Sequence, residues 1–96
     1  MADTQPPFTI QHDEAHHRFE THVDGHQGVV DYELDGPVMR IVHTVVHPAL
    51  EGRGIAAALI KSTLQHARSH GLKVDPQCPY ARAYMERHPD TKDLRT

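Results

Sequence analysis

The sequence predicts an α+β (α/β) domain in which an antiparallel meander of strands is followed by a strand-helix-strand-helix unit. Three observations support this prediction: alternating apolar residues in the first half of the chain, a glycine-bearing turn at residues 51–56, and helical spacing directly after that turn. A chain of 96 residues has the length of one compact domain. We expect a single domain with a mixed sheet over residues 8–94, after a flexible N-terminal segment, 1–7.

The first half of the chain has the period of two that half-buried strands require. Four strands are predicted, at Phe8–Gln11, Arg18–Val23, Gln27–Leu34 and Val38–Val46. Asp24-Gly25 and Asp35-Gly36-Pro37 are turn sequences, so the last three strands should form two adjacent hairpins. The fourth strand is the longest apolar run and is rich in β-branched residues, so we expect it to be central and covered on both faces.

The second half of the chain changes to helical spacing. Apolar residues from Ile55 onward recur on one helical face, and Gly71 is a helix stop. A short strand at Leu72–Val74 and a helix at Pro79–His88 follow, with proline at the first helical position. The crossover should therefore place the last strand parallel to the fourth one. The tail after Pro89 is polar and predicts no further element.

The composition restricts the classes of function and the compartment. A formal charge of −3 provides no broad positive field, so a nucleic-acid partner is not expected. Ten histidines make the charge sensitive to pH near neutrality. The single cysteine, Cys78, excludes an intramolecular disulfide and fits a reducing compartment. No apolar run indicates a signal peptide or a membrane span, so we expect a cytoplasmic protein.

The turn between the fourth strand and the first helix has the features of an anion-binding site. Gly52 and Gly54 allow the backbone to approach a phosphate closely, and the free N–H groups of the helix start point outward. Arg53 can add a cation, while Ala56 leaves room for the ligand. The alternative is that the two glycines only make a tight strand-to-helix connection.

The segment Glu51-Gly52-Arg53-Gly54-Ile55-Ala56 resembles the Gln/Arg-x-x-Gly-x-Gly/Ala signature of the GCN5-related N-acetyltransferase (GNAT) superfamily. His43-Thr44 and Cys78-Pro79-Tyr80 are similar to the small branch of that superfamily. The resemblance implies a GNAT-like fold and acetyl-coenzyme A as cofactor. Glu51 stands where the family has Gln or Arg. The residues implied in cofactor binding are Val45, Val46, Glu51, Gly52, Arg53, Gly54, Ile55 and Ala56.

Acyl transfer needs a base for the amine, and the small branch often has Glu where this chain has Val45. His43 and His47 are the nearby replacements, since imidazole titrates in the right range. Strand alternation places both on the face of Val45. Either histidine could instead be a surface or packing residue.

Two residues near the second helix are further candidates for catalysis. Cys78 directly precedes this helix, whose dipole favours a thiolate, and the resemblance implies that it faces the acyl group. It could form an acyl-cysteine relay, make a simple contact, or be a small buried residue. Tyr80 is a candidate proton donor. Relatives often have this tyrosine at the position of Met85, and Tyr84 is one residue away from it.

Histidines with the spacing of one helical turn also occur at two places, His12 with His16 and His66 with His70. The first pair lies in a segment without helical signals, and we expect a polar loop there. We expect the second pair to lie on an exposed face of a helix. We predict no metal site from either pair.

The sequence therefore predicts an acetyl-coenzyme A binding N-acetyltransferase-like protein that transfers acetyl to an amine, a peptide or a protein. The sequence does not define the acceptor, and it leaves open whether the protein forms a homodimer. The alternative function is a coenzyme A binding or sensing module without catalysis, because the strand lacks the usual acidic residue and the segment that walls the acceptor site in relatives is short.

Overall fold

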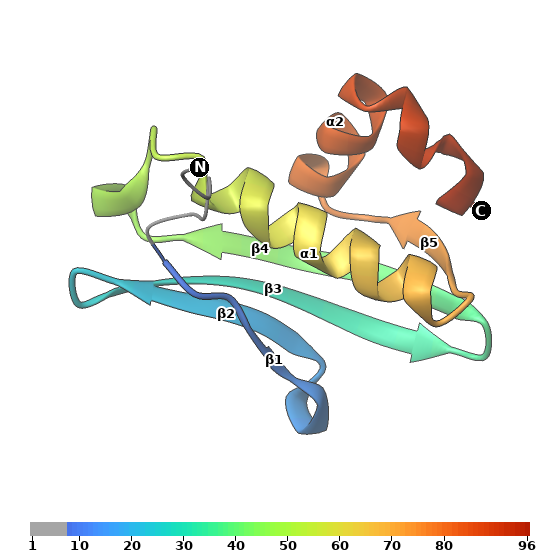
Figure 1. Ribbon diagram of the computed structural model, residues 1–96, viewed down its shortest axis with the longest axis horizontal. Coiled ribbons are helices and arrows are strands. Elements are labelled where there is room, and N and C mark those ends of the chain that lie inside the picture. The colour runs from blue at the N-terminus through green and yellow to red at the C-terminus, as the bar shows by residue number, and fades with distance from the viewer. Residues whose placement is uncertain (1–7) are drawn as a thin grey trace, which may run out of the picture.

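The protein has the predicted α+β class, with one sheet of five strands in the order β1-β2-β3-β4-β5. The computed structural model describes residues 8–96, so the segment predicted to be flexible, 1–7, lies outside the described residues. Strands β1 to β4 pair antiparallel, and β5 joins β4 in parallel after the crossover through α1 (Figure 1). The elements are β1 (Gln11–Asp13), η1 (Glu14–His16), β2 (Arg18–Val23), β3 (His26–Asp35), β4 (Val38–Val46), η2 (Pro48–Leu50), α1 (Ile55–Ser69), β5 (Lys73–Pro76), α2 (Pro79–Arg87) and η3 (Pro89–Leu94).

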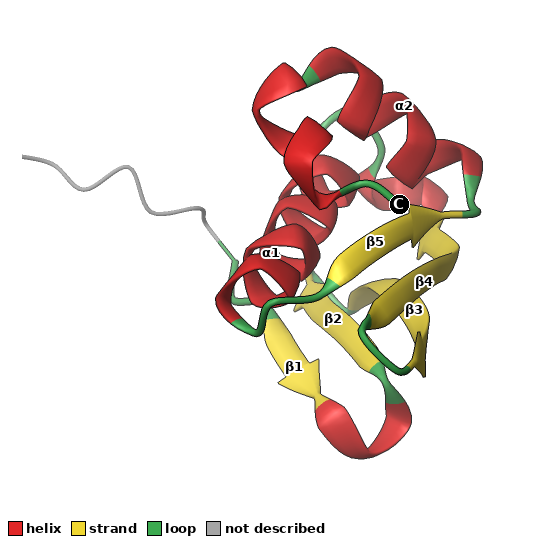
Figure 2. Ribbon diagram, turned by 90° about the vertical axis from the view of Figure 1, so that its right-hand side faces the viewer, coloured by secondary structure: helices red, strands yellow, loops and turns green. Residues whose placement is uncertain are grey.

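The helices cover one face of the sheet and leave the other face open (Figure 2). Helix α1 contacts strands β2 to β5, and α2 contacts β4, β5 and α1. The expectation that β4 is covered on both faces is wrong, because only one layer of helices is present over the described residues. On the open face, His43 and Val45 are exposed despite the apolar character of the strand. Among the described residues no helix is long and apolar enough to cross a membrane.

The core lies between α1 and the covered face of the sheet. Helix α1 contributes side chains at helical spacing, namely Ile55, Leu59, Ile60, Leu64 and Ala67. The sheet contributes alternating residues, namely Phe19, Val30, Tyr32, Met39, Ile41 and Val74. Burying a large apolar side chain contributes about 1.5–3 kcal/mol relative to exposure, so this layer holds α1 firmly on the sheet.

Gly28 on β3 allows the start of α1 to approach the sheet closely. A Cβ atom at this position would lie 3.2 Å from Ile55 Cγ2 and 3.2 Å from Leu59 Cδ1. A contact of that length is too tight for well-packed carbon atoms. The absence of a side chain at Gly28 therefore lets Ile55 and Leu59 of α1 pack closely against β3.

Strand β4 contains one extra residue relative to β3. Consecutive residues of β3 pair with Ile41 and with His43, so Val42 has no partner across this ladder. Such a bulge changes the alternation of side chains along the strand. Ile41 points into the core, His43 lies on the open face, and Thr44 returns to the face covered by the helices.

Two regions differ from the sequence prediction. The first strand begins only at Gln11, and the expected polar loop after it is a strand end followed by η1, which Asp13 caps by accepting a hydrogen bond from the N–H of His16 at 3.3 Å. The tail after Pro89 folds as η3 because Thr91 and Leu94 bury against the core, too few anchors to give a sequence signal. Its end continues beside β5, where Arg95 bridges to Val74.

Candidate functional site

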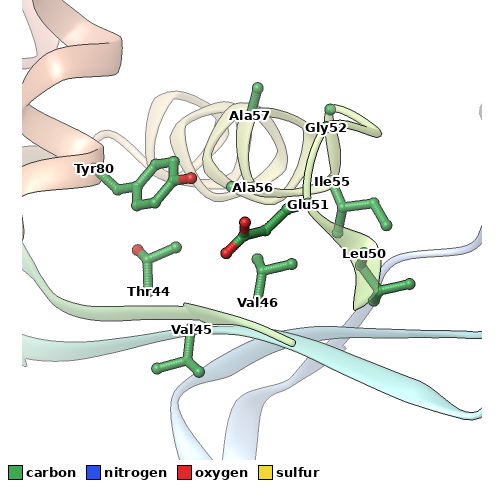
Figure 3. Close-up of a pocket in the computed structure, with 11 residues that line it drawn as sticks. Thr44, Val45, Val46, Leu50, Glu51, Gly52, Ile55, Ala56, Ala57 and Tyr80 are labelled. Carbon is green, nitrogen blue, oxygen red and sulfur yellow. The ribbon is translucent and has the colours of Figure 1, made fainter. Parts of the chain in front are cut away.

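A cleft of about 640 Å³ opens between the second half of β4, the turn before α1, the start of α1 and Tyr80. Figure 3 shows Thr44 and Val46 pointing into it from β4, while Val45 points to the opposite side of the strand. The residues that line it are Thr44, Val45, Val46, Leu50, Glu51, Gly52, Gly54, Ile55, Ala56, Ala57 and Tyr80. The cleft thus lies where a strand end, a glycine turn and two helix starts meet.

One wall of the cleft is an unpaired edge of β4. The parallel ladder with β5 runs only from Val38 to Ile41, and β5 ends at Pro76. The carbonyl oxygen of Ile41 then accepts from the N–H groups of Gln77 and Cys78, at 3.0 and 3.1 Å, as the chain turns toward α2. Beyond that point the edge of β4 facing the cleft has no strand partner among residues 8–96. Its backbone groups are available to an extended ligand.

The opposite wall is the N-terminus of α1. Gly52 and Gly54 have φ of 81° and 75°, a conformation that glycine adopts without the strain of a side chain. Gly54 caps the helix without a side-chain hydrogen bond, and its carbonyl oxygen accepts from Ala58 N at 3.0 Å. The N–H groups of Ile55, Ala56 and Ala57 therefore have no partner within the helix. They form an anion-binding cradle with the helix dipole behind it.

The charged side chains of this turn do not support anion binding. The carboxylate of Glu51 points into the cleft, toward Val46 (Figure 3). Arg53 instead donates from Nη1 to the Oδ2 of Asp24 at 3.0 Å and does not line the cleft. No lysine, arginine or histidine is among the lining residues in the described part of the chain. An anion held here would therefore be bound chiefly by backbone N–H groups.

Cys78 lies behind the cleft rather than in it. The residue is 6% exposed, and its side chain caps the N-terminus of α2 by accepting a hydrogen bond from Ala81 N at 3.3 Å. Its sulfur lies 3.2 Å from the hydroxyl oxygen of Thr44, which does line the cleft. The thiol thus contacts a residue that lines the cleft but does not line the cleft itself.

The other predicted catalytic residues lie on different sides of the sheet. Tyr80, in the first turn of α2, is 55% exposed, and its hydroxyl points across the cleft toward Ala56 and Glu51 (Figure 3). His43 lies on the open face of the sheet, away from the cleft. His47 stacks on His26 with ring centroids 4.1 Å apart and accepts from Ala49 N at 3.0 Å. Of these residues, only Tyr80 lies in the cleft.

The family profile described as GCN5-related N-acetyl-transferase matches residues 18–94, a range that includes every residue of the cleft. The chain belongs to this family. The resemblance predicted from residues 51–56 is thereby confirmed, and the protein is acetyltransferase-like.

Individual relatives support the family assignment over most of the length of the chain. Protein NATD1 from mouse is 31% identical over 86 residues, which cover 86% of this chain and 78% of the mouse protein. Human protein NATD1 is also 31% identical, over 76% of its length. The solution structure of a GCN5-like protein from Staphylococcus aureus matches with a TM-score of 0.74 and 26% identity, over 92% of this chain and 87% of that one.

The structure places most of the predicted cofactor residues around this one cleft and adds others. Arg53 is the member that does not line it. Thr44, Leu50 and Ala57 line the cleft but were not predicted. The signal for Ala57 was present in the sequence, because it belongs to the same run of small residues as Ala56. Thr44 belongs to the His43-Thr44 pair of the family resemblance, but its direction toward the helices follows only from the bulge.

Proposed function

We propose that this cleft binds acetyl-coenzyme A and that the protein transfers the acetyl group to an amine. The observation that carries the proposal is the unpaired edge of β4 facing, across one cleft, the N-terminus of α1, which has no side-chain cap. The first wall suits the amide groups of a pantetheine arm, and the second suits a diphosphate. Both parts of coenzyme A are thus matched by backbone groups a short distance apart.

The residues present fit the cofactor sterically as well. A Cβ atom at Gly52 or at Gly54 would meet nothing within 4 Å, so the space over the helix start is open. When bound, acetyl-coenzyme A would supply the activated acyl group. The N–H groups of Ile55, Ala56 and Ala57 would hold the diphosphate. A free N–H on the β4 edge would polarise the thioester carbonyl, and the Tyr80 hydroxyl would donate a proton to the departing thiolate.

We propose direct transfer rather than a relay through Cys78. A relay requires the thiolate to attack the thioester carbon, form an acyl-cysteine with loss of the coenzyme A thiolate, and then pass the acyl group to the amine. Cys78 is 6% exposed, its sulfur contacts Thr44, and it is not among the residues that line the cleft, so it is poorly placed for both attacks. Contact through Thr44 is the simpler role for Cys78.

A second function, coenzyme A binding without turnover, is favoured by one observation. Glu51 is the only carboxylate or imidazole among the described lining residues, and its carboxylate points into the cleft toward Val46. A base to deprotonate the amine would then have to be water or the acceptor itself. The open side of the cleft leaves the acceptor free to be a small amine, a peptide or a protein.

Titration calorimetry with acetyl-coenzyme A tests the cofactor site, with Gly54→Asp as the variant. The new carboxylate would project over the cradle, and the expected loss of affinity is about tenfold or more. Gly36→Asp is the matched control, because Gly36 also has a positive φ of 58° and open space around its Cβ position, and it lies in the turn before β4. Its affinity should equal that of the unmodified protein.

The result has two ways of contradicting the proposal. Absence of binding to the unmodified protein would remove the cofactor assignment. If Gly54→Asp binds acetyl-coenzyme A as tightly as the unmodified protein does, the cofactor does not bind at this helix start. If binding is found, transfer of labelled acetyl to a panel of amines and peptides separates the enzyme from the binding module, since the module retains affinity without turnover.

A further inference from the structure

A second pocket, of about 410 Å³, lies at the opposite end of α1 and is lined by four histidines. Two of them come from the N-terminal edge of the sheet and two from the last turns of α1. We call the four residues the imidazole cluster: His12, His17, His66 and His70. Glu14, Tyr32, Leu34 and Leu72 complete the lining. None of these residues belongs to the coenzyme A cleft.

His12 connects the cluster to the core. Its ring stacks flat on Phe19, with centroids 4.0 Å apart and planes inclined by 4°. Its Nε2 lies 2.6 Å from the hydroxyl oxygen of Tyr32, and its ring meets His66 edge-on at 4.4 Å. His66 in turn stacks on His70 at 4.0 Å. Three aromatic rings, one each from β2, β3 and α1, thus meet around one imidazole of β1.

The packing favours neutral rings. Burial lowers the pKa of His12 below its ordinary value, and the neighbouring His70 and His17 lower this pKa further. The carboxylates of Glu14 and Asp13, in the same segment as His12, act in the opposite direction. From β2 it faces the uncharged ring of Phe19, and from β3 the hydroxyl of Tyr32. Burial also lowers the pKa of His66, with further contributions from His12 and His70 and opposition from Glu14. A second proton in the cluster would therefore meet both desolvation and like charge.

The cluster does not have the geometry of a metal centre. Stacked rings direct their nitrogen atoms along different lines, whereas a tetrahedral site needs nitrogens that converge on one point. Among residues 8–96, no group of three or more His, Cys, Asp or Glu side chains is arranged to hold an ion. The ligand that this arrangement can exchange is the proton.

The segment held by His12 has few other attachments. β1 is a three-residue edge strand that pairs only with β2, and η1 has no buried residue. The chain is also attached on both sides of this segment: before it, Phe8 and Ile10 pack against the core and the Thr21 hydroxyl donates to the carbonyl oxygen of Thr9 at 2.7 Å, and after it the Tyr32 N–H donates to the carbonyl oxygen of His17 at 3.0 Å. Short edge elements with few buried contacts open at low free energy. His12 is therefore the main contact between β1 and the core.

We propose that the imidazole cluster is a proton-operated clasp that holds Gln11–His16 on the sheet when neutral and releases this segment when protonated. An imidazolium at His12 would be pressed against Phe19 beside the rings of His66 and His70. Release lets it regain water and separates it from the α1 histidines. It also uncovers Phe19 and the outer edge of β2, while the cleft at the other end of α1 stays assembled.

Hydrogen exchange measured by mass spectrometry on the full chain tests this clasp. Protection of the β1–β2 amides, corrected for intrinsic exchange rates, should fall about tenfold or more between about pH 7.5 and about pH 5.5. Protection of the β3–β4 ladder should change far less. His12→Phe keeps a ring on Phe19 without a titrating group, and its β1–β2 protection should be independent of pH. His22→Gln, at an exposed position of β2, is the matched control and should behave like the unmodified protein.

Constant β1–β2 protection across this pH range in the unmodified protein would overturn the proposal, and so would an equal fall in His12→Phe. NMR titration of the imidazole resonances needs no variant. Titration of His12 and His66 below the ordinary histidine value of 6.5 supports the clasp, and titration at or above it contradicts the clasp.

Discussion

The sulfur of Cys78 lies 3.2 Å from the hydroxyl oxygen of Thr44, and this contact joins the N-cap of α2 to the wall of the cleft. The sequence made Cys78 a candidate nucleophile, whereas the structure gives it two hydrogen-bonding contacts and little exposure. The contacts of Cys78 hold α2, and therefore Tyr80, in a fixed position relative to β4. The contact thus links a buried residue to the geometry of the proposed site.

Cys78→Ser should keep the transfer rate, because a hydroxyl can cap α2 and bond to Thr44 as the thiol does. Cys78→Ala should cost about 1 kcal/mol in unfolding free energy through loss of the cap. Acetyl transfer and chemical denaturation measure the two effects. A fall of about a hundredfold in the rate of Cys78→Ser, with the fold intact, would instead support the acyl-cysteine relay.

Glu51→Gln should bind acetyl-coenzyme A about three- to tenfold more tightly, because it removes a negative charge beside the diphosphate cradle. The gain should shrink at high salt, since the cleft is open to solvent. Calorimetry at two ionic strengths measures both effects. Glu86→Gln, on an exposed position of α2, is the charge-matched control. Weaker binding by Glu51→Gln would show that the carboxylate contacts the ligand favourably.

Tyr80→Phe should lower kcat by about a hundredfold with little change in KM, because the variant loses only the hydroxyl that we propose as proton donor to the leaving thiolate. Tyr84→Phe provides the comparison. Tyr84 stacks on His88 at 3.9 Å and packs against the core, outside the cleft. Steady-state kinetics measure kcat and KM for both variants. Equal kcat values for Tyr80→Phe and Tyr84→Phe would show that the Tyr80 hydroxyl is not the proton donor.

The unfolding free energy should fall as the pH drops through about 6.5. The pKa values of His12 and His66 are lowered by burial in the folded protein, so the unfolded chain takes up protons first. The stabilisation that these two histidines contribute is fully present above their pKa in the unfolded chain. It is lost progressively as the pH falls from that value to their lower pKa in the folded protein. Thermal unfolding across this range should show a smaller decrease for His12→Phe. A melting temperature that rises on acidification would contradict this sign.

The periodicity of the sequence was enough to locate β2, β4 and both helices, because apolar spacing there agrees with the final packing. It did not give the orientation of the second half of β4. Uninterrupted alternation from Ile41 would turn His43 inward and Thr44 outward, and the bulge at Val42 reverses both. A bulge depends on pairing with β3, which no local pattern records.

The imidazole cluster was beyond prediction for a similar reason. His12 lies in a polar segment, and His66 is far from it along the chain. Only the position of α1 above the sheet brings their rings together. The glycine turn was predictable because its chemistry lies within six consecutive residues.

The unpaired edge of β4 is also a hazard for the ligand-free protein. Exposed strand edges pair readily with the same edge of another molecule, which leads to aggregation. Here α2 and Tyr80 stand beside that edge and restrict access to it. An extended ligand lying along β4 would occupy the remaining backbone groups. Solubility at high protein concentration should therefore improve on adding the ligand, by a route independent of any gain in folding stability.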